Sequence, residues 1–272
     1  MSTTALTADI PRARKRRWSP RLVQAELLKL RKRRGLVAAV AALTILPMVI
    51  AYVVLLSMHA NDSVTHGPAG GLDNFTSSMD LLTTLTVVAA VLVGATLGTG
   101  DLSAGVFREL VVTGRSRLAL FAVRVPAGLA VLLPFAGLGF AVTAGASLAF
   151  SGYLPQPSGT LLWEGAVWLA LTASIALAIS LGVSSLVSSR GTSIGVLLAW
   201  QLAAMPVLMQ IKSLGWFREV LFYTAATRIE PAAMVGDGPV VPMSLSAAIA
   251  VLVAWTVIPL GLGAWRTVTR DA

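Results

Sequence analysis

Six long apolar stretches alternate with shorter polar segments along this 272-residue chain. A helix needs about 20 apolar residues to cross the hydrocarbon core of a bilayer, which is roughly 30 Å thick. Each stretch comes close to that length. The predicted spans are residues 36–58, 81–98, 125–150, 161–187, 192–211 and 245–265. The pattern therefore predicts an all-α integral membrane protein, in which residues 18–272 form one domain of six transmembrane helices.

A basic segment precedes the first span. Residues 1–17 are polar and then strongly basic, and we expect them to form a disordered tail. A helix should follow, because Ser19 can cap free backbone N–H groups and Pro20 suits the first helical turn. Its apolar stripe is predicted at Val23, Leu27 and Leu30. Glu26 and Lys29 are predicted to lie off that stripe, so that the helix rests in the membrane interface.

The first span has one alternative interpretation, a cleaved secretory signal peptide. A basic cluster at residues 31–34 precedes the span, and small residues lie near Ala60. A signal peptide, however, has an apolar core of only about 7–15 residues. The length of residues 36–58 favours a retained transmembrane helix.

The segment between the last two spans, residues 212–243, is too polar to cross a membrane. Apolar and aromatic side chains recur there at i, i+1, i+4, i+5 and i+8, at Trp216, Phe217, Val220, Leu221 and Thr224. This spacing predicts one amphipathic helix whose aromatic rings suit the level of the lipid headgroups. Pro231 is expected to end or bend a second short helical piece.

Composition and charge support a membrane protein and narrow its chemistry. Hydrophobic residues make up 56% of the chain and charged residues 12%, whereas soluble domains carry about 25% charged residues. Cysteine is absent, which excludes disulfides, thiolate metal sites and a cysteine nucleophile. If loops alternate sides, 18 of the 21 Lys and Arg residues fall on one side, which the positive-inside rule makes cytoplasmic. The net charge of +9 then reports topology, with both termini cytoplasmic, and nucleic-acid binding is not expected.

The spans lack the groups that an ion-driven transporter or a membrane enzyme needs. No ionisable residue is predicted near the centre of a span, and Asp80 and Glu164 are interpreted as lying at span ends. His59 and His66 fall at or beyond the end of the first span, so no buried bis-histidine haem site or histidine base is expected. The chain also lacks the phosphate-binding loop G-x-x-x-x-G-K-[ST]. We therefore expect no metal, no cofactor and no enzymatic activity on this chain.

Two G-x-x-x-G motifs predict close helix contacts. Gly94 and Gly98 lie in the second span, and Gly191 and Gly195 open the fifth. Small residues at this spacing let helix backbones approach each other. The sequence leaves open whether the contacts form within one chain or between subunits.

The segment between spans two and three carries the strongest functional hint. Asp101 or Ser103 can cap a short helix, and Thr113-Gly114 can end it. Its apolar face is predicted at Val106, Phe107, Leu110 and Val111, with Arg108 and Glu109 pointing elsewhere. Such a helix on the inner membrane surface suits docking to a cytoplasmic partner, although a positive-inside anchor would also need the arginines.

At this point the chain resembles the membrane subunit of type-2 ABC exporters. Two stretches carry the resemblance, residues 25–34 (AELLKLRKRR) and residues 100–117, which begin GDLSAGVFREL and end GRSR. The resemblance implies that the first is an elbow helix containing Glu26, Lys29 and Arg31. It implies that the second is a coupling helix that contacts the ATPase through Asp101, Val106, Phe107, Arg108, Glu109 and Arg115. Asp101 stands for the family's usual acid, and Val106 replaces its usual threonine.

The resemblance also implies partners and a transport path. Two membrane subunits, identical or paralogous, would sit in the cytoplasmic membrane above two separate ATPase subunits that bind ATP and Mg²⁺. A hydrophobic or amphipathic substrate would leave the cell along spans two and five, past Thr84, Thr96 and Gln201. Two alternatives stay open: a non-transporting scaffold or immunity protein that binds partners, and a membrane-embedded enzyme, which the missing nucleophile–base pair disfavours.

Overall fold

The computed structural model describes residues 20–103, 116–187, 189–235 and 241–269, and helices are the regular secondary structure of these residues. Six helical segments are long and apolar enough to cross a membrane. They are Arg34–Asn61, Leu72–Gly100, Arg117–Ala149, Gly159–Leu186, Arg190–Gln210 and Leu245–Thr269. The predicted all-α fold with six transmembrane helices is thereby confirmed.

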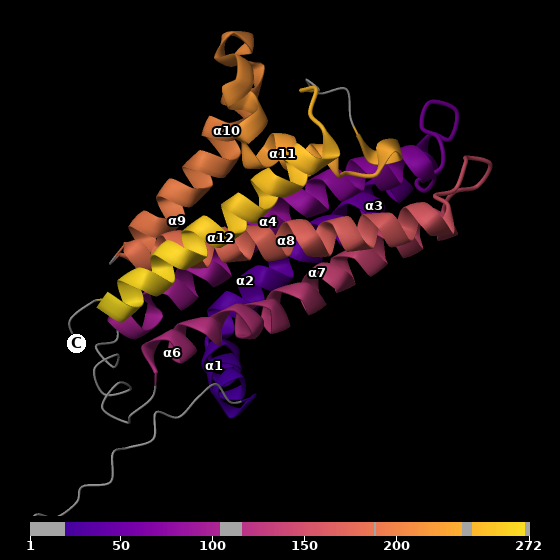
Figure 1. The fold of residues 1–272 in the computed structure, drawn as a ribbon. Coiled ribbons are helices and arrows are strands. Elements are labelled where there is room, and N and C mark those ends of the chain that lie inside the picture. The colour runs from indigo at the N-terminus through magenta and orange to yellow at the C-terminus, as the bar shows by residue number, and fades with distance from the viewer. Residues whose placement is uncertain (1–19, 104–115, 188, 236–240, 270–272) are drawn as a thin grey trace, which may run out of the picture.

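Several of the six segments are built from more than one element (Figure 1). The first half of the chain contains α1 (Pro20–Lys32), α2 (Arg34–Thr44), α3 (Leu46–Asn61), α4 (Leu72–Ser103), α6 (Arg117–Ala122) and α7 (Arg124–Ala149). The second half contains α8 (Gly159–Leu186), α9 (Arg190–Ala199), the π-helix η1 (Trp200–Ala204), α10 (Met205–Gln210) and α12 (Leu245–Thr269). Two 3₁₀ helices, η2 (Lys212–Val220) and η3 (Ala232–Met234), flank α11 (Phe222–Arg228).

The bundle has two distinct ends. The basic end carries α1, the last turns of α4 and α12 and the start of α6, and Arg117 donates a hydrogen bond there to the carbonyl of Val268 (Figure 1). The loop end carries the turns around residues 62–71 and 150–158 and the elements η2, α11 and η3. Figure 1 shows α9 and α10 leaning away from the other helices toward the loop end.

The second transmembrane helix is longer than predicted. α4 begins at Leu72, inside the stretch expected to be a loop, because the side-chain amide of Asn74 donates to the carbonyls that precede the helix. It also continues through Ser103, so Asp101 lies in its last turn. The short helix predicted to follow, with Asp101 or Ser103 as its cap, lies outside the described residues. Gly98 does not break α4, since it packs tightly against α8. The 29 residues of this span measure about 43 Å, more than the hydrocarbon core.

The first helix faces the bundle differently from the prediction. α1 begins at Pro20, as expected, and packs on α7. Its buried residues are Leu22, Glu26 and Leu30, so Glu26 lies on the buried face and not off the apolar stripe. The Nζ atom of Lys29 lies 2.6 Å from Oε1 of Glu26. This ion pair is the physical reason why the carboxylate can be buried among apolar side chains.

The prediction of a single amphipathic helix after the fifth span is wrong. Gly215 has a φ of 53°, which kinks η2, and Leu221 is extended, so that the chain breaks before α11. Leu221 is buried while Trp216 is 73% exposed, although the pattern had put both on one face. Glycine reaches this positive φ without steric cost, and the helical spacing is lost at the kink.

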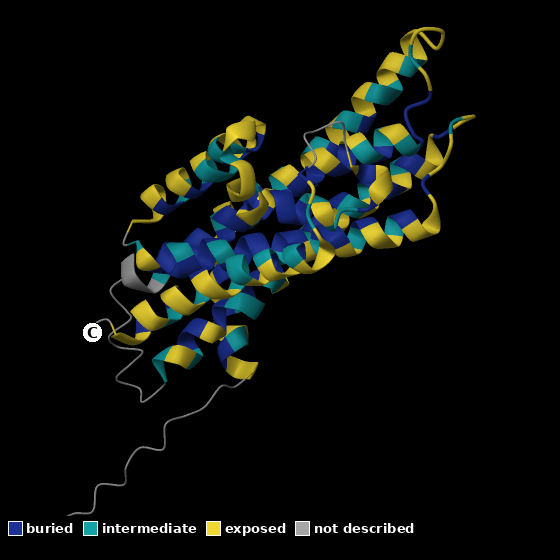
Figure 2. Ribbon diagram, turned by 45° about the horizontal axis from the view of Figure 1, so that its top comes forward, coloured by how far each residue is buried: buried dark blue, intermediate teal, exposed yellow. Residues whose placement is uncertain are grey.

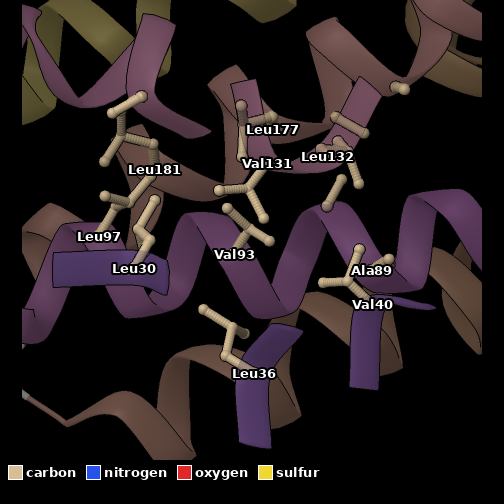
Figure 3. Packing of buried hydrophobic residues seen from close by; sticks show 14 of the residues in the cluster. Leu30, Leu36, Val40, Ala89, Val93, Leu97, Val131, Leu132, Leu177 and Leu181 are labelled. Carbon is tan, nitrogen blue, oxygen red and sulfur yellow. The ribbon is translucent and has the colours of Figure 1, made fainter. Parts of the chain in front are cut away.

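The core lies where α4 and α8 cross the other helices. The largest buried cluster joins apolar side chains of α1, α2, α4, α7 and α8, among them Val93, Leu132 and Leu177 (Figure 3). Figure 2 shows the buried residues concentrated in the middle of the bundle. In the apolar windows of the spans formed by α9 with α10 and by α12, only 22% and 17% of the residues are buried, as expected of helices that face lipid or another subunit.

The two glycine motifs differ in their surroundings. A Cβ atom built on Gly94 would lie 2.6 Å from Cβ of Ser180, and one built on Gly98 would lie 2.6 Å from Cβ of Ser184. The motif of the second span therefore forms a close contact between α4 and α8 within the chain. No described atom lies within 4 Å of a Cβ built on Gly191 or Gly195. A contact of that second motif with another subunit stays a prediction.

Candidate functional site

A cavity of about 800 Å³ lies toward the loop end. It is lined by α4, α8, the fifth span and the α11–η3 segment, and it is partly open, since Asp80 and Tyr223 in its lining are exposed. Its lining includes Asp80, Thr83, Thr84, Val87, Trp168, Thr172, Gln201, Leu202, Pro206, Phe222, Tyr223, Arg228 and Glu230. A volume of this size matches sites that bind drug-sized molecules.

The inner wall of the cavity is formed by α4 and α8, whose lining residues recur at helical spacing. Asp80, Thr83, Thr84 and Val87 of α4 follow one another at i, i+3, i+4 and i+7, which places them on one helical face. Trp168 and Thr172 are four residues apart on α8. Because α4 and α8 are locked together at the Gly94 contact, these two faces meet the cavity from fixed directions.

The fifth span bends around the cavity through a π-helical turn. Gln201 and Leu202 lie in η1, and Pro206 follows in α10. Proline has no backbone N–H, so Pro206 cannot donate to the carbonyl of Leu202, and its ring crowds that carbonyl. The local π-helical winding accommodates this defect. In this π-helical turn, Gln201 faces the cavity and forms part of its lining.

Two hydrogen bonds hold the outer wall, one from the buried Trp168 and one from the exposed Arg228. Nε1 of Trp168 donates to the carbonyl of Ala226 at 3.3 Å and so ties α11 to α8. Nε of Arg228 donates to the carbonyl of Met243 at 2.8 Å, which holds the end of α11 against the segment that enters α12. These bonds place the residues of α11 opposite the acidic face of α4.

The cavity contains polar groups whose hydrogen-bonding capacity is unused. Within the described residues, the carboxylates of Asp80 and Glu230 have neither an ion pair nor a hydrogen bond. The hydroxyls of Thr83 and Thr172 are buried without a partner. Burial, and after it the charge of Asp80, raises the pKa of Glu230 to about 8. Burial likewise raises the pKa of Tyr223.

Three residues were predicted along a transport path, and the structure separates them. Thr84 and Gln201 line the cavity. Thr96 lies farther along α4, is buried, and donates its hydroxyl to the carbonyl of Leu92 at 2.7 Å. The cavity therefore brings together two of the three.

Of the residues predicted to contact the ATPase, the structure describes the backbone of Asp101 alone. Asp101 belongs to the final turn of α4 at the basic end. Val106, Phe107, Arg108, Glu109 and Arg115 lie outside the described residues. Glu26, Lys29 and Arg31 of the elbow helix are on α1, also at the basic end. The turn that contains Asp101 and the three predicted elbow residues are therefore separated from the cavity by the length of the bundle.

Sequence reasoning missed the acidic lining. Asp80 was assigned to a span end, but α4 starts at Leu72 and places Asp80 two turns inside the helix. Glu230 was part of a segment interpreted as interfacial. The spacing of Asp80, Thr83 and Thr84 was the available signal, because three polar residues on one face of an apolar helix need a polar neighbour. Among the described residues, no group of three or more His, Cys, Asp or Glu could hold a metal ion.

The comparison with known proteins agrees with this architecture. The family described as ABC-2 family transporter protein matches residues 22–207, which include α1, the first four spans and most of the fifth. No curated protein matches the chain. The family match covers more than half of the sequence, and together with the six membrane-spanning helices it shows that this chain belongs to the ABC-2 family of transporter proteins.

Proposed function

We propose that this chain is the transmembrane permease subunit of an ATP-binding cassette exporter in the cytoplasmic membrane. It moves a hydrophobic or amphipathic substrate out of the cell. The observation that carries the proposal is the cavity of about 800 Å³ at the loop end of an ABC-2 family bundle. ABC-2 membrane subunits are generally the non-catalytic part of a transporter, so ATP and Mg²⁺ would bind to separate ATPase subunits.

The distribution of Lys and Arg residues supports the proposed orientation of the bundle in the membrane. Ten of the 13 Lys and Arg residues in the described part of the chain belong to segments at the basic end, which the positive-inside rule places in the cytoplasm. The cavity would then lie toward the outside, between the second and fifth spans along which export is expected. A second membrane subunit, a copy or a paralogue, would cover the exposed apolar helices.

The orientation can be tested by cysteine labelling, because the natural chain has no cysteine and gives no background. Val64→Cys, at a position 96% exposed at the loop end, should react in intact cells with a membrane-impermeant maleimide. Gln24→Cys, exposed on α1, should react only after the membrane is permeabilised. The reverse pattern would place the basic end outside and contradict the proposed topology.

The proposed partnership can be tested by copurification from native membranes. The tagged chain should retain an ATPase with a phosphate-binding loop, and Arg108→Glu should release most of it by reversing a charge in the predicted coupling segment. Arg190→Glu serves as the control, because this exposed arginine also belongs to the basic end but lies outside that segment.

Two outcomes would contradict the proposal. Recovery of the wild-type chain without any such ATPase would contradict the proposal that a separate ATPase subunit powers transport. Unchanged function after the partner's ATP hydrolysis is abolished would instead favour a scaffold or immunity protein, which needs binding but no turnover.

A further inference from the structure

The cavity has a chemical character more specific than that of an apolar passage. Four side chains in its lining carry charge or titrate: Asp80 from α4, Tyr223 and Arg228 from α11, and Glu230 after it. The one cation among them, Arg228, donates Nε to the carbonyl of Met243 and makes no ion pair with either acid in the described structure. Two carboxylates therefore share the cavity with one cation, and in the described structure neither forms an ion pair with it.

Buried hydroxyls give a second and independent indication of a ligand. In α4 and α8 five of the nine buried serines and threonines donate to the carbonyl four residues earlier, as Thr99 and Ser180 do. Thr86, which is buried outside the cavity lining, has no partner. Thr83, 9% exposed, and Thr172, 5% exposed, line the cavity and have no hydrogen-bond partner. An unmade bond at a buried polar group costs about 1–3 kcal/mol, so these hydroxyls favour a polar guest.

The apolar part of the lining suits the same guest. Trp168, Phe222 and Tyr223 bring three aromatic rings to the cavity. Aromatic faces attract organic cations through their quadrupole, most strongly in sites that exclude water. Carboxylates and aromatic rings that line one cavity are the groups that recognise an ammonium or phosphonium centre with apolar substituents, and the free hydroxyls can bond polar atoms elsewhere in such a guest.

We propose that the cavity binds lipophilic organic cations, with Asp80 and Glu230 as counter-charges and the aromatic side chains as their apolar contacts. This inference rests on the proposed export function for its biological meaning and names the class of cargo. Binding itself does not depend on the ATPase.

Protons compete with such a ligand. Because the pKa of Glu230 is raised to about 8, its carboxyl is mostly protonated at pH 7 and becomes ionised as the pH rises through that value. A permanent cation is attracted to the ionised form, so its affinity should increase between pH 7 and pH 9. Glu230→Gln should abolish this increase, since the amide does not titrate.

The test uses two ions of nearly equal size and shape and opposite charge, tetraphenylphosphonium and tetraphenylborate. Equilibrium dialysis against the full-length chain in detergent measures both. The cation should bind and the anion should bind at least about tenfold more weakly, as expected for a charge held near unpaired carboxylates. Asp80→Asn should weaken cation binding by a similar factor. Glu164→Gln removes an exposed carboxylate of the same end outside the cavity and should change nothing.

The outcomes separate this inference from the proposed function. Equal binding of both ions, no binding of the cation, or full affinity in Asp80→Asn would overturn the inference, even if an ATPase copurifies. Charge-selective binding without any copurifying ATPase would instead overturn the proposed function and leave the cation site standing. A size-exclusion profile matching wild type shows that the Asp80→Asn and Glu230→Gln chains are folded.

Discussion

Replacing Gly94 with isoleucine is expected to destabilise the bundle by about 3 kcal/mol, the upper end of the usual cost of overpacking. A Cβ at this position would lie 2.6 Å from Cβ of Ser180 and 2.8 Å from the backbone nitrogen of Leu181. Backbone cannot move aside as a flexible side chain can, so α4 and α8 must separate. The thermal unfolding midpoint of the detergent-solubilised chain measures the loss.

Gly137 provides the matched control for this prediction. It is an exposed glycine inside α7, and no described atom lies within 4 Å of a Cβ built on it. Gly137→Ile should leave the midpoint nearly unchanged, because the new side chain meets lipid and not another helix. Equal midpoints for the two isoleucine variants would show that the α4–α8 contact is looser than the structure describes.

Truncation of Trp168 to alanine is the second large effect. The indole is 7% exposed, belongs to the core cluster of the loop end and donates its N–H to the carbonyl of Ala226. Its loss leaves a void and an unpaired carbonyl, and such truncations cost about 3–5 kcal/mol in protein cores. We expect the midpoint to fall by roughly 6–15 °C and α11 to detach from α8.

Trp163 lies on the same helix and tests whether position or residue type matters. It is 71% exposed, so Trp163→Ala should shift the midpoint little. Limited proteolysis after α10 adds a local measurement, because a detached α11 is cleaved faster. If both tryptophan variants unfold alike and α11 stays protected, Trp168 does not hold the outer wall.

The six spans were predictable because apolar length depends on local composition alone. The ends of the helices were harder to predict. Polar residues such as Asp73 and Asn74 extend α4 beyond the hydrocarbon core, and their polarity is typical of a loop. Arg124 shows the same difficulty: it falls just outside the predicted third span, residues 125–150, yet it begins α7 and is 2% exposed. Burial of a charged residue depends on tertiary neighbours that the sequence pattern does not reveal.

The cavity could not be predicted as a unit. Asp80 and Glu230 are far apart in the sequence, and their approach depends on the kink at Gly215 and on the bond from Trp168 to Ala226. Thr84 and Gln201 were chosen because they lie in the second and fifth spans. That choice identifies the correct helices, but it does not tell which positions along each helix line the cavity. Thr96 shares a helix with Thr84 and still lies outside the lining for that reason.

The length of α4 has a thermodynamic consequence. One helix of 32 residues carries Asp80 in the cavity wall and Asp101 in the turn where an ATPase is expected to dock. If cargo binding shifts the equilibrium position of this helix, linkage requires reciprocity: whatever factor the docked nucleotide state applies to cargo affinity, bound cargo applies to that state. A cation in the cavity should therefore change the nucleotide affinity of the ATPase subunits at the other end of the bundle, even before any substrate has crossed the membrane.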